Sequence, residues 1–324
     1  MNCYKKTKQF MIFTCCLMAG KVVRGQDIYY ADVQDMKVWY NPALKTNKTS
    51  LLHANFRSVD YQSIIAYTSK GATIELPLSS HDKKEDNIGY ADLAVGLNAD
   101  NSSDGTIRVS TAMMAFSYAL PLNYDNTYLA AGLQCAYTFN LVSLSGYNLF
   151  PDHFDQYGAL GSALAADPYQ SGYEYDYFTA GAGVAVFHTG KEKQWYFGGS
   201  IRHLNQPYTE WTHTVRLSMN DGIQAGYSAA FTDEDALGGY AYLNWEGAVH
   251  EQIAGLLYTR NLDDSSRYDF SLGLGYRVGD ALIPNIGLKF GDNRIAFYYE
   301  FILSGNSANA YNRTAFEFSY SLVL

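Results

Sequence analysis

The chain has 324 residues, with 29 Tyr, 17 Phe and 28 Gly against only 7 Pro and 4 Cys. Its formal net charge of −9 argues against a nucleic-acid partner, because neutralising phosphates requires clustered Lys and Arg. The length fits two soluble domains or one large barrel. High tyrosine content favours a barrel in a membrane, where rings with a polar tip lie at the membrane–water boundary, although a tyrosine-rich soluble β-protein remains an alternative.

The first 25 residues predict a secretory signal peptide. Residues 1–8 are basic, residues 10–20 are apolar, and Val23-Arg24-Gly25 offers a cleavage site before Gln26. The apolar part is too short for a membrane-spanning helix, which needs about 20 apolar residues. Cys135 would be the one cysteine of the mature chain, so the sequence predicts no internal disulfide.

Residues 26–48 predict an ordered N-terminal arm. This stretch is polar and aromatic, and Asn41-Pro42-Ala43 lies near its end. The Asn–Pro step biases Asn41 away from helix. We expect the arm to lie inside or across the rest of the fold.

Residues 49–324 alternate between short strand patterns and polar turns. No apolar run beyond the leader is long enough for a spanning helix, so an exported chain is either soluble or a closed β-barrel. The predicted strands are Leu51–Arg57, Gln62–Thr68, Ala72–Leu78, Gly89–Asn98, Thr106–Leu120, Thr127–Phe139, Tyr173–Phe187, Trp195–Leu204, Trp211–Met219, Ile223–Phe231, Gly239–Trp245, Gln252–Arg260, Tyr268–Tyr276, Ile283–Phe290, Arg294–Leu303 and Arg313–Val323. This spacing predicts an all-β fold, an antiparallel up-and-down transmembrane β-barrel of about 14 strands (about 12–16).

The last two strands show which face is polar. Phe316, Phe318 and their alternate neighbours share one face of the final strand, and Glu317 lies on the other. We expect this strand to close the barrel against the first strand, with the apolar face outward. Glu300, in an otherwise apolar strand, should also face the lumen because a lipid-facing charge is costly. A half-buried edge strand of a soluble sheet is the alternative.

The sequence offers little catalytic chemistry. Asp152-His153-Phe154-Asp155, in a long loop over residues 141–172, lacks the further ligands of a closed metal site. The strands contain His203 and His213, but no Gly-x-Ser-x-Gly motif accompanies them. Asn205 and Pro207 favour a structural role for His203, as a cap at a strand end. We therefore predict no catalytic residue, no metal and no cofactor.

Two motifs together resemble a known family. These are the Asn41-Pro42-Ala43 arm and the strand Phe197-Gly198-Gly199-Ser200 that leads into His203-Leu204-Asn205-Gln206-Pro207. Gly275–Ala281, Ala296–Glu300 and Phe316-Glu317 add to the likeness, which covers nearly the whole exported chain. The chain resembles the PorP/SprF family, outer-membrane proteins of the type IX secretion and gliding apparatus of Bacteroidetes.

The resemblance implies a non-enzymatic outer-membrane barrel that anchors or assists export of a secreted surface protein or adhesin. Its implied partners are that cargo, periplasmic secretion and gliding components, and outer-membrane lipid. The residues it singles out for a structural or partner-binding role are Asn41, Pro42, Ala43, His203, Leu204, Asn205, Gln206, Pro207, Glu300 and Glu317. The alternatives are a porin or hydrophobic-solute channel, and an outer-membrane lipid hydrolase that would use His203 or His213.

Overall fold

A computed structural model describes residues 30–46, 48–61, 65–78, 89–122, 126–143, 154–155, 158–159, 173–190, 192–209, 215–263, 267–303 and 313–324. The predicted signal peptide over residues 1–25 lies outside the described residues, as do the side chains of Asp152–Asp155. No helix in the described part of the chain is long and apolar enough to cross a membrane.

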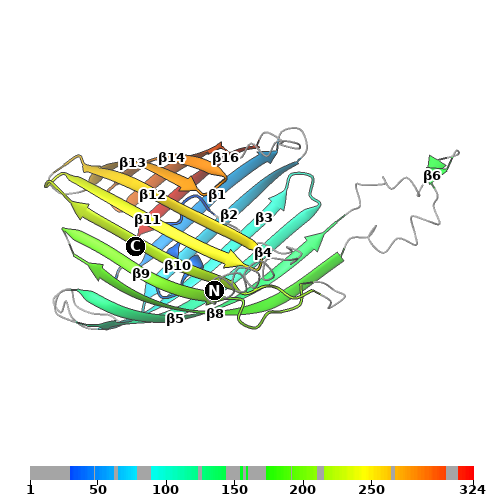
Figure 1. Ribbon diagram of the computed structural model, residues 1–324, viewed down its shortest axis with the longest axis horizontal. Coiled ribbons are helices and arrows are strands. Elements are labelled where there is room, and N and C mark those ends of the chain that lie inside the picture. Colours follow the sequence, from blue (N-terminus) through cyan, green and yellow to red (C-terminus); the bar gives the residue numbers. More distant parts are fainter. Residues whose placement is uncertain are drawn as a thin grey trace, which may run out of the picture.

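Fourteen strands close into one barrel (Figure 1). They are β1 Leu51–Tyr61, β2 Ile65–Pro77, β3 Tyr90–Ser102, β4 Ile107–Pro121, β5 Thr127–Val142, β8 Tyr173–Thr189, β9 Lys193–Arg202, β10 Asn220–Ala230, β11 Asp235–Glu246, β12 Val249–Asn261, β13 Tyr268–Arg277, β14 Ala281–Phe290, β15 Asn293–Ile302 and β16 Arg313–Val323. Neighbours in the chain pair antiparallel, and β1 pairs with β16 from Leu51↔Val323 to Tyr61↔Arg313. The predicted antiparallel barrel and its strand number are confirmed.

Two short elements lie apart from this ring. β6 Phe154–Asp155 and β7 Gly158–Ala159 form a two-stranded sheet within the connection from β5 to β8. The helix α2 Lys37–Tyr40 belongs to the arm, which Figure 1 shows in blue inside the ring of strands.

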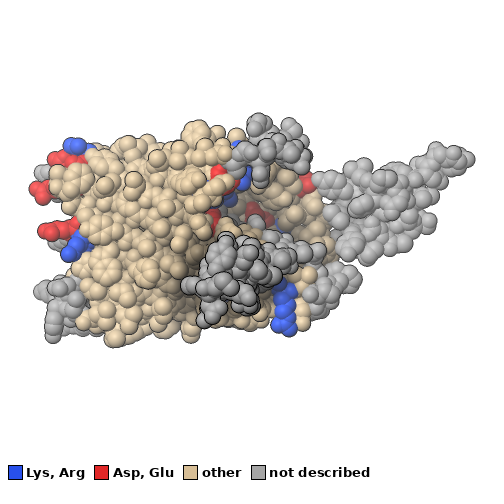
Figure 2. Space-filling model, viewed as in Figure 1, with Lys and Arg blue, Asp and Glu red and all other residues tan. Residues whose placement is uncertain are grey.

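The wall of the barrel is apolar on its outer face. Large side chains at alternate strand positions point outward and are well exposed, including Leu97, Leu133, Val184, Phe197 and Leu256. In Figure 2 the wall nearest the viewer is almost free of charged residues, which gather toward the two ends. Apolar side chains outside and polar ones inside, with a period of two, are the pattern of a barrel that faces lipid.

The two ends of the barrel differ. The connections β5–β8, β9–β10 and β15–β16 all lie at one end, which we call the loop end. The other end, which we call the terminal end, holds the start of β1, the finish of β16, the connection β2–β3 and short turns such as that between β14 and β15. The arm fills the barrel toward the terminal end, where Arg294 on β15 and Glu75 on β2 contact it.

The strand predictions are wrong in two places. Gln62–Thr68 and Ala72–Leu78 do not form two strands, since β2 runs unbroken through Gly71. That glycine makes room for the arm and is not part of a turn: a Cβ there would lie 2.6 Å from Tyr30 Oη.

The second error concerns Trp211–Met219, of which residues 215–219 are described. These residues form no strand, and their one bridge pairs Arg216 with Tyr208. The segment instead folds back on the residues after β9, with Leu217 N donating to Pro207 O at 2.8 Å and Thr209 N to Val215 O at 2.9 Å. β10 begins only at Asn220.

Candidate functional site

Asn41 fastens the arm to the inner wall of the barrel. Its Nδ2 lies 3.0 Å from Gln224 Oε1 on β10, 3.2 Å from Gly199 O on β9 and 3.3 Å from Val184 O on β8. Its Oδ1 accepts a bond from Ala43 N at 2.9 Å, which fixes the turn after it. The side chain is fully buried and uses both its polar atoms, so this contact specifies one position for the arm.

Glycines on the wall create the space that the arm occupies. A Cβ at Gly183 would lie 2.0 Å from Asn41 Oδ1, and one at Gly132 would lie 2.6 Å from the carbonyl carbon of Pro42. Larger side chains at Gly183 on β8 or Gly132 on β5 would displace the arm. These two glycines are therefore part of the site. Asn41, Pro42 and Ala43 thus form one buried latch between arm and wall.

Glu317 holds the start of the arm. It faces the lumen from β16 and accepts bonds from Ala31 N at 2.6 Å, Asp32 N at 3.2 Å and Asn55 Nδ2 at 2.9 Å. Ser319, next on the same face, donates to Asp32 Oδ2 at 2.5 Å. A carboxylate that binds two successive backbone amides fixes the backbone of the arm as well as its position.

Ion pairs secure the arm toward the terminal end. Arg294 Nη1 on β15 contacts Asp35 Oδ2, and Lys45 Nζ lies 3.0 Å from Glu75 and 3.6 Å from Asp92. Burial alone would raise the pKa of Asp35, but the Arg294 guanidinium outweighs burial and holds that pKa at about 2. The Asp35 carboxylate is therefore charged at neutral pH, as its contact with Arg294 requires.

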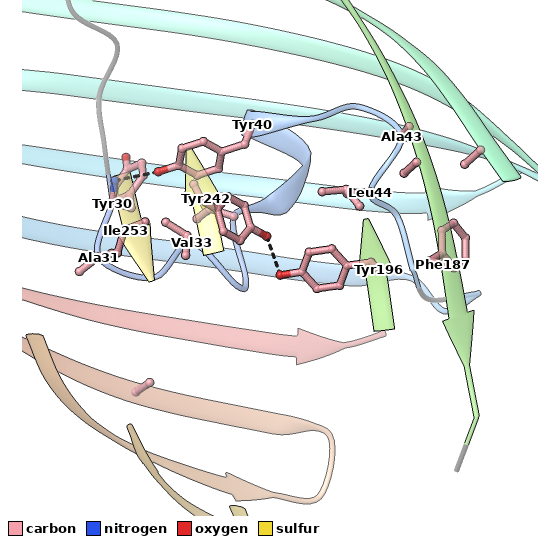
Figure 3. Packing of buried hydrophobic residues seen from close by; sticks show 14 of the residues in the cluster. Tyr30, Ala31, Val33, Tyr40, Ala43, Leu44, Phe187, Tyr196, Tyr242 and Ile253 are labelled. Carbon is pink, nitrogen blue, oxygen red and sulfur yellow. Dashed lines mark hydrogen bonds between the residues drawn. The ribbon is translucent and has the colours of Figure 1, made fainter. Parts of the chain in front are cut away.

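A set of buried tyrosines fills the space between arm and wall (Figure 3). Tyr196 Oη on β9 donates to Tyr242 Oη on β11 at 3.2 Å, and the Tyr242 ring meets the Tyr40 ring edge-on at 5.4 Å. Tyr30 N donates to Tyr40 Oη at 3.3 Å. These rings lie in the lumen, so the main apolar core of this barrel is the contact between the arm and the wall.

Glu300 lies at the centre of a charge cluster in the loop-end half of the lumen. Arg57 Nη2 lies 2.7 Å from its Oε1, and Arg277 Nη1 lies 2.8 Å from its Oε2. Glu300 is 2% exposed. A buried carboxylate needs oppositely charged partners such as these two guanidinium groups, because an unpaired buried charge is strongly unfavourable. Glu300 therefore faces the lumen and cross-links β1, β13 and β15.

The cluster continues into an open cavity of about 510 Å³ at the loop end. Arg277 Nε bonds Glu251 Oε1 at 3.0 Å, and Arg313 Nη2 bonds Asp280 Oδ2 at 2.6 Å, all within its lining. Acidic and basic side chains are visible in the hollow toward the loop end in Figure 2. The loop-end half of the lumen thus offers charges of both signs to whatever enters it.

The turn after β9 is held by the side chain of Asn205. Its Nδ2 donates to Phe178 O at 2.7 Å, and its Oδ1 accepts from Ala180 N at 3.0 Å. Leu204 N donates to Ala180 O at 2.9 Å, and its side chain is 46% exposed. Asn205 therefore continues the β8–β9 pairing beyond the last residue of β9.

His203 and Gln206 give this turn its shape. Both have positive φ, +58° and +42°, which is rare for residues other than glycine. His203 is buried, with Nδ1 3.2 Å from Ser218 O, and Pro207 O accepts from Leu217 N. The structure places all five motif residues in one turn that joins β8, β9 and the segment before β10, and it brings none of them to Glu300 or Glu317.

Replacing Asn205 with alanine should destabilise the barrel by about 1–3 kcal/mol, because both backbone partners on β8 lose their bonds. Leu204→Ala is the matched control, since it keeps the backbone bond and removes an exposed side chain. Urea unfolding of the purified protein in detergent, followed by tryptophan fluorescence, measures both. Equal midpoints for the two variants would contradict the role of Asn205.

Sequence reasoning missed the partners of the predicted residues. Arg57 and Arg277 point inward next to Glu300, and Gln224 completes the bonds of Asn41. For the two arginines, the available signal was opposite charge at inward positions of β1, β13 and β15, which analysis of one strand at a time does not compare.

A closed ring of fourteen strands, apolar outside and polar within, defines a membrane β-barrel of the outer-membrane type. The chain belongs to the PorP/SprF family: the family described as type IX secretion system membrane protein PorP/SprF matches residues 22–322. This match confirms the resemblance that the motifs indicated. A comparison with curated proteins finds no match.

Solved structures with the same barrel include two hydrocarbon transporters. The chain is 10% identical to the Ralstonia pickettii toluene transporter TbuX, covering 90% of this chain and 94% of that one, with a TM-score of 0.53. It is 9% identical to a deletion mutant of the monoaromatic hydrocarbon channel TodX, covering 89% and 94%, with a TM-score of 0.53. At this identity the likeness shows the fold alone.

Proposed function

We propose that this type IX secretion membrane protein anchors a secreted surface protein or adhesin at the outer membrane, or assists its export, without enzymatic activity. The observation that carries the proposal is the asymmetry of the lumen. The arm packs across it toward the terminal end, while a cavity of about 510 Å³ opens at the loop end. Such a barrel suits holding a partner better than conducting a solute.

The orientation follows from the same asymmetry. Outer-membrane barrels place short turns in the periplasm and longer loops outside the cell. The cavity would then face the exterior and meet the cargo, and the terminal end would face periplasmic secretion and gliding components. The proposed organisation is a signal peptide over residues 1–25, the arm over 26–48 and the barrel over 49–324.

A porin or hydrophobic-solute channel is the alternative function. The likeness to TbuX and TodX concerns the fold, and the buried latch at Asn41 places protein where a solute would pass. The residues of the latch and of the turn at His203–Pro207 are structural in this proposal, and Glu300 positions Arg57 and Arg277, which line the binding cavity.

Deleting the gene should release one large surface protein into the medium or trap it inside the cell, while the rest of the outer-membrane proteome is unchanged. Mass spectrometry of medium, surface and periplasmic fractions measures this. Complementation with the wild-type gene should restore attachment. If no secreted protein changes its location, the anchoring function is wrong.

A further inference from the structure

Several buried polar atoms in the loop-end half of the lumen have no bonding partner among the described residues. They include Asn140 Nδ2, both polar atoms of Asn244 and Glu251 Oε2. Buried polar groups are rarely left unbonded, so these atoms indicate a place for a ligand.

These three side chains are deeply buried and point into the lumen. Asn140, Asn244 and Glu251 are 6%, 1% and 7% exposed. Asn244 and Glu251 face each other across the β11–β12 pair, and Glu251 lines the 510 Å³ cavity. Arg277 binds only Oε1 of Glu251, which leaves the second oxygen for another donor.

The bonding requirements of these side chains, on β5, β11 and β12, match a polypeptide backbone. Each asparagine amide offers a donor and an acceptor side by side, and a peptide unit supplies the complementary acceptor and donor. The second oxygen of Glu251 accepts a backbone N–H or a basic side chain. A hydrocarbon solute would satisfy none of these atoms, which costs free energy for each buried group.

Three tyrosines of β8 lie near Asn140. Tyr175 lies opposite Asn140 in the β5–β8 pair, and it stacks between Tyr173 and Tyr177 with centroid distances of 5.9 and 6.3 Å. Tyrosine at a rim with polar neighbours is typical of protein–protein interfaces.

We propose that Asn140, Asn244 and Glu251 bind an extended segment of the secreted protein inside the loop-end half of the lumen. The backbone amides of that segment pair with the two asparagines, and an N–H or a basic side chain reaches Glu251. This inference rests on the proposed function and names the part of the barrel that grips the cargo.

Cysteine protection in whole cells tests it. Tyr61→Cys, in the lining of the same cavity and in a Cys135→Ser background, is treated with a membrane-impermeant maleimide in two strains, one with and one without the gene for the surface protein that the deletion experiment identifies. Labelling should be at least about tenfold faster without that protein, as expected when one or two bonded contacts exclude the reagent. Val249→Cys, also in the lining, is the second variant if Tyr61→Cys does not assemble. Leu243→Cys, outward on β11, should remain unlabelled in both strains.

A double substitution gives an independent readout. Asn244→Ala with Glu251→Gln should lower surface attachment of that protein at least about tenfold while the barrel assembles normally. Glu234→Gln, at the terminal end, should leave attachment unchanged.

The outcomes separate the two proposals. Equal labelling in both strains, with attachment lost only on gene deletion, overturns the lumen site and leaves anchoring intact. If glycosidase treatment removes the protection and protease treatment does not, the ligand is a glycan and the proposed polypeptide is wrong. If gene deletion moves no protein, both proposals fail.

Discussion

Gly183→Leu is expected to release the arm and turn a nearly closed barrel into a conducting pore. A Cβ at this position would lie 2.0 Å from Asn41 Oδ1, so the leucine and the latch cannot occupy the lumen together. A barrel of this size without its arm leaves an aqueous channel, and we expect conductance in planar bilayers to rise at least about tenfold.

Gly199 provides the matched control for that variant. It lies outward on the neighbouring strand, where a Cβ would meet nothing closer than Gly222 O at 3.7 Å, so Gly199→Leu should conduct like the wild type. Asn41→Ala should also raise the conductance, because it removes the bonds of the latch. Mobility on unheated gels reports whether each barrel is folded. If Gly183→Leu and Asn41→Ala both fold and conduct like the wild type, the latch does not close the barrel.

Glu300→Ala should destabilise the barrel by about 3–5 kcal/mol, because it leaves Arg57 and Arg277 buried beside each other without their shared carboxylate. The exposed pair of Arg260 and Glu234 is the control. Its N–O distance is 2.8 Å, against 2.7 Å for Arg57 and Glu300, but the Glu234 side chain is 59% exposed and that of Glu300 is 1% exposed. Since the distances match, the difference between the two variants measures burial.

Glu234→Ala should change stability by at most about 0.5 kcal/mol, as exposed ion pairs contribute little. Guanidinium unfolding in detergent, with unheated gel mobility as the readout, compares the two. Similar losses for both glutamates would show that the buried cluster does not cross-link the strands as its geometry indicates.

The alternation of the strands was readable from the sequence because side chains on a strand alternate strictly between two environments. Lipid outside and a polar lumen inside make every inward charge conspicuous, which is why Glu300 and Glu317 could be placed on the lumen face. The final strand predicted closure for the same reason, and β1 pairs with β16 as expected.

The arm explains most of what the sequence did not reveal. Residues 69–71 lie between two predicted strands, yet Gly71 continues β2 and leaves space for Tyr30. A glycine that accommodates a distant segment has the same local signature as a glycine in a turn. Its partner lies far away in the chain, so local pattern carries no information about it.

The connection before β10 shows a second limit. Residues 215–219 have an alternating pattern but lie after the strained turn at His203 and Gln206, which sends the chain back over the loop end. Positive φ at residues other than glycine is set by the surrounding bonds, here those of Asn205 and Pro207, and it cannot be deduced from residue type.

The reactivity of two positions on β1 tests the central claim most directly. Tyr61 and His53 both face the lumen; Tyr61 lines the loop-end cavity, and His53 is buried in the terminal half beside Ser321 and Glu75. In purified protein with Cys135→Ser, Tyr61→Cys should react with maleimide at least about 100-fold faster than His53→Cys, because reagent reaches position 53 only when the arm opens. Equal reaction rates at the two positions would contradict a lumen that the arm closes on one side and leaves open on the other.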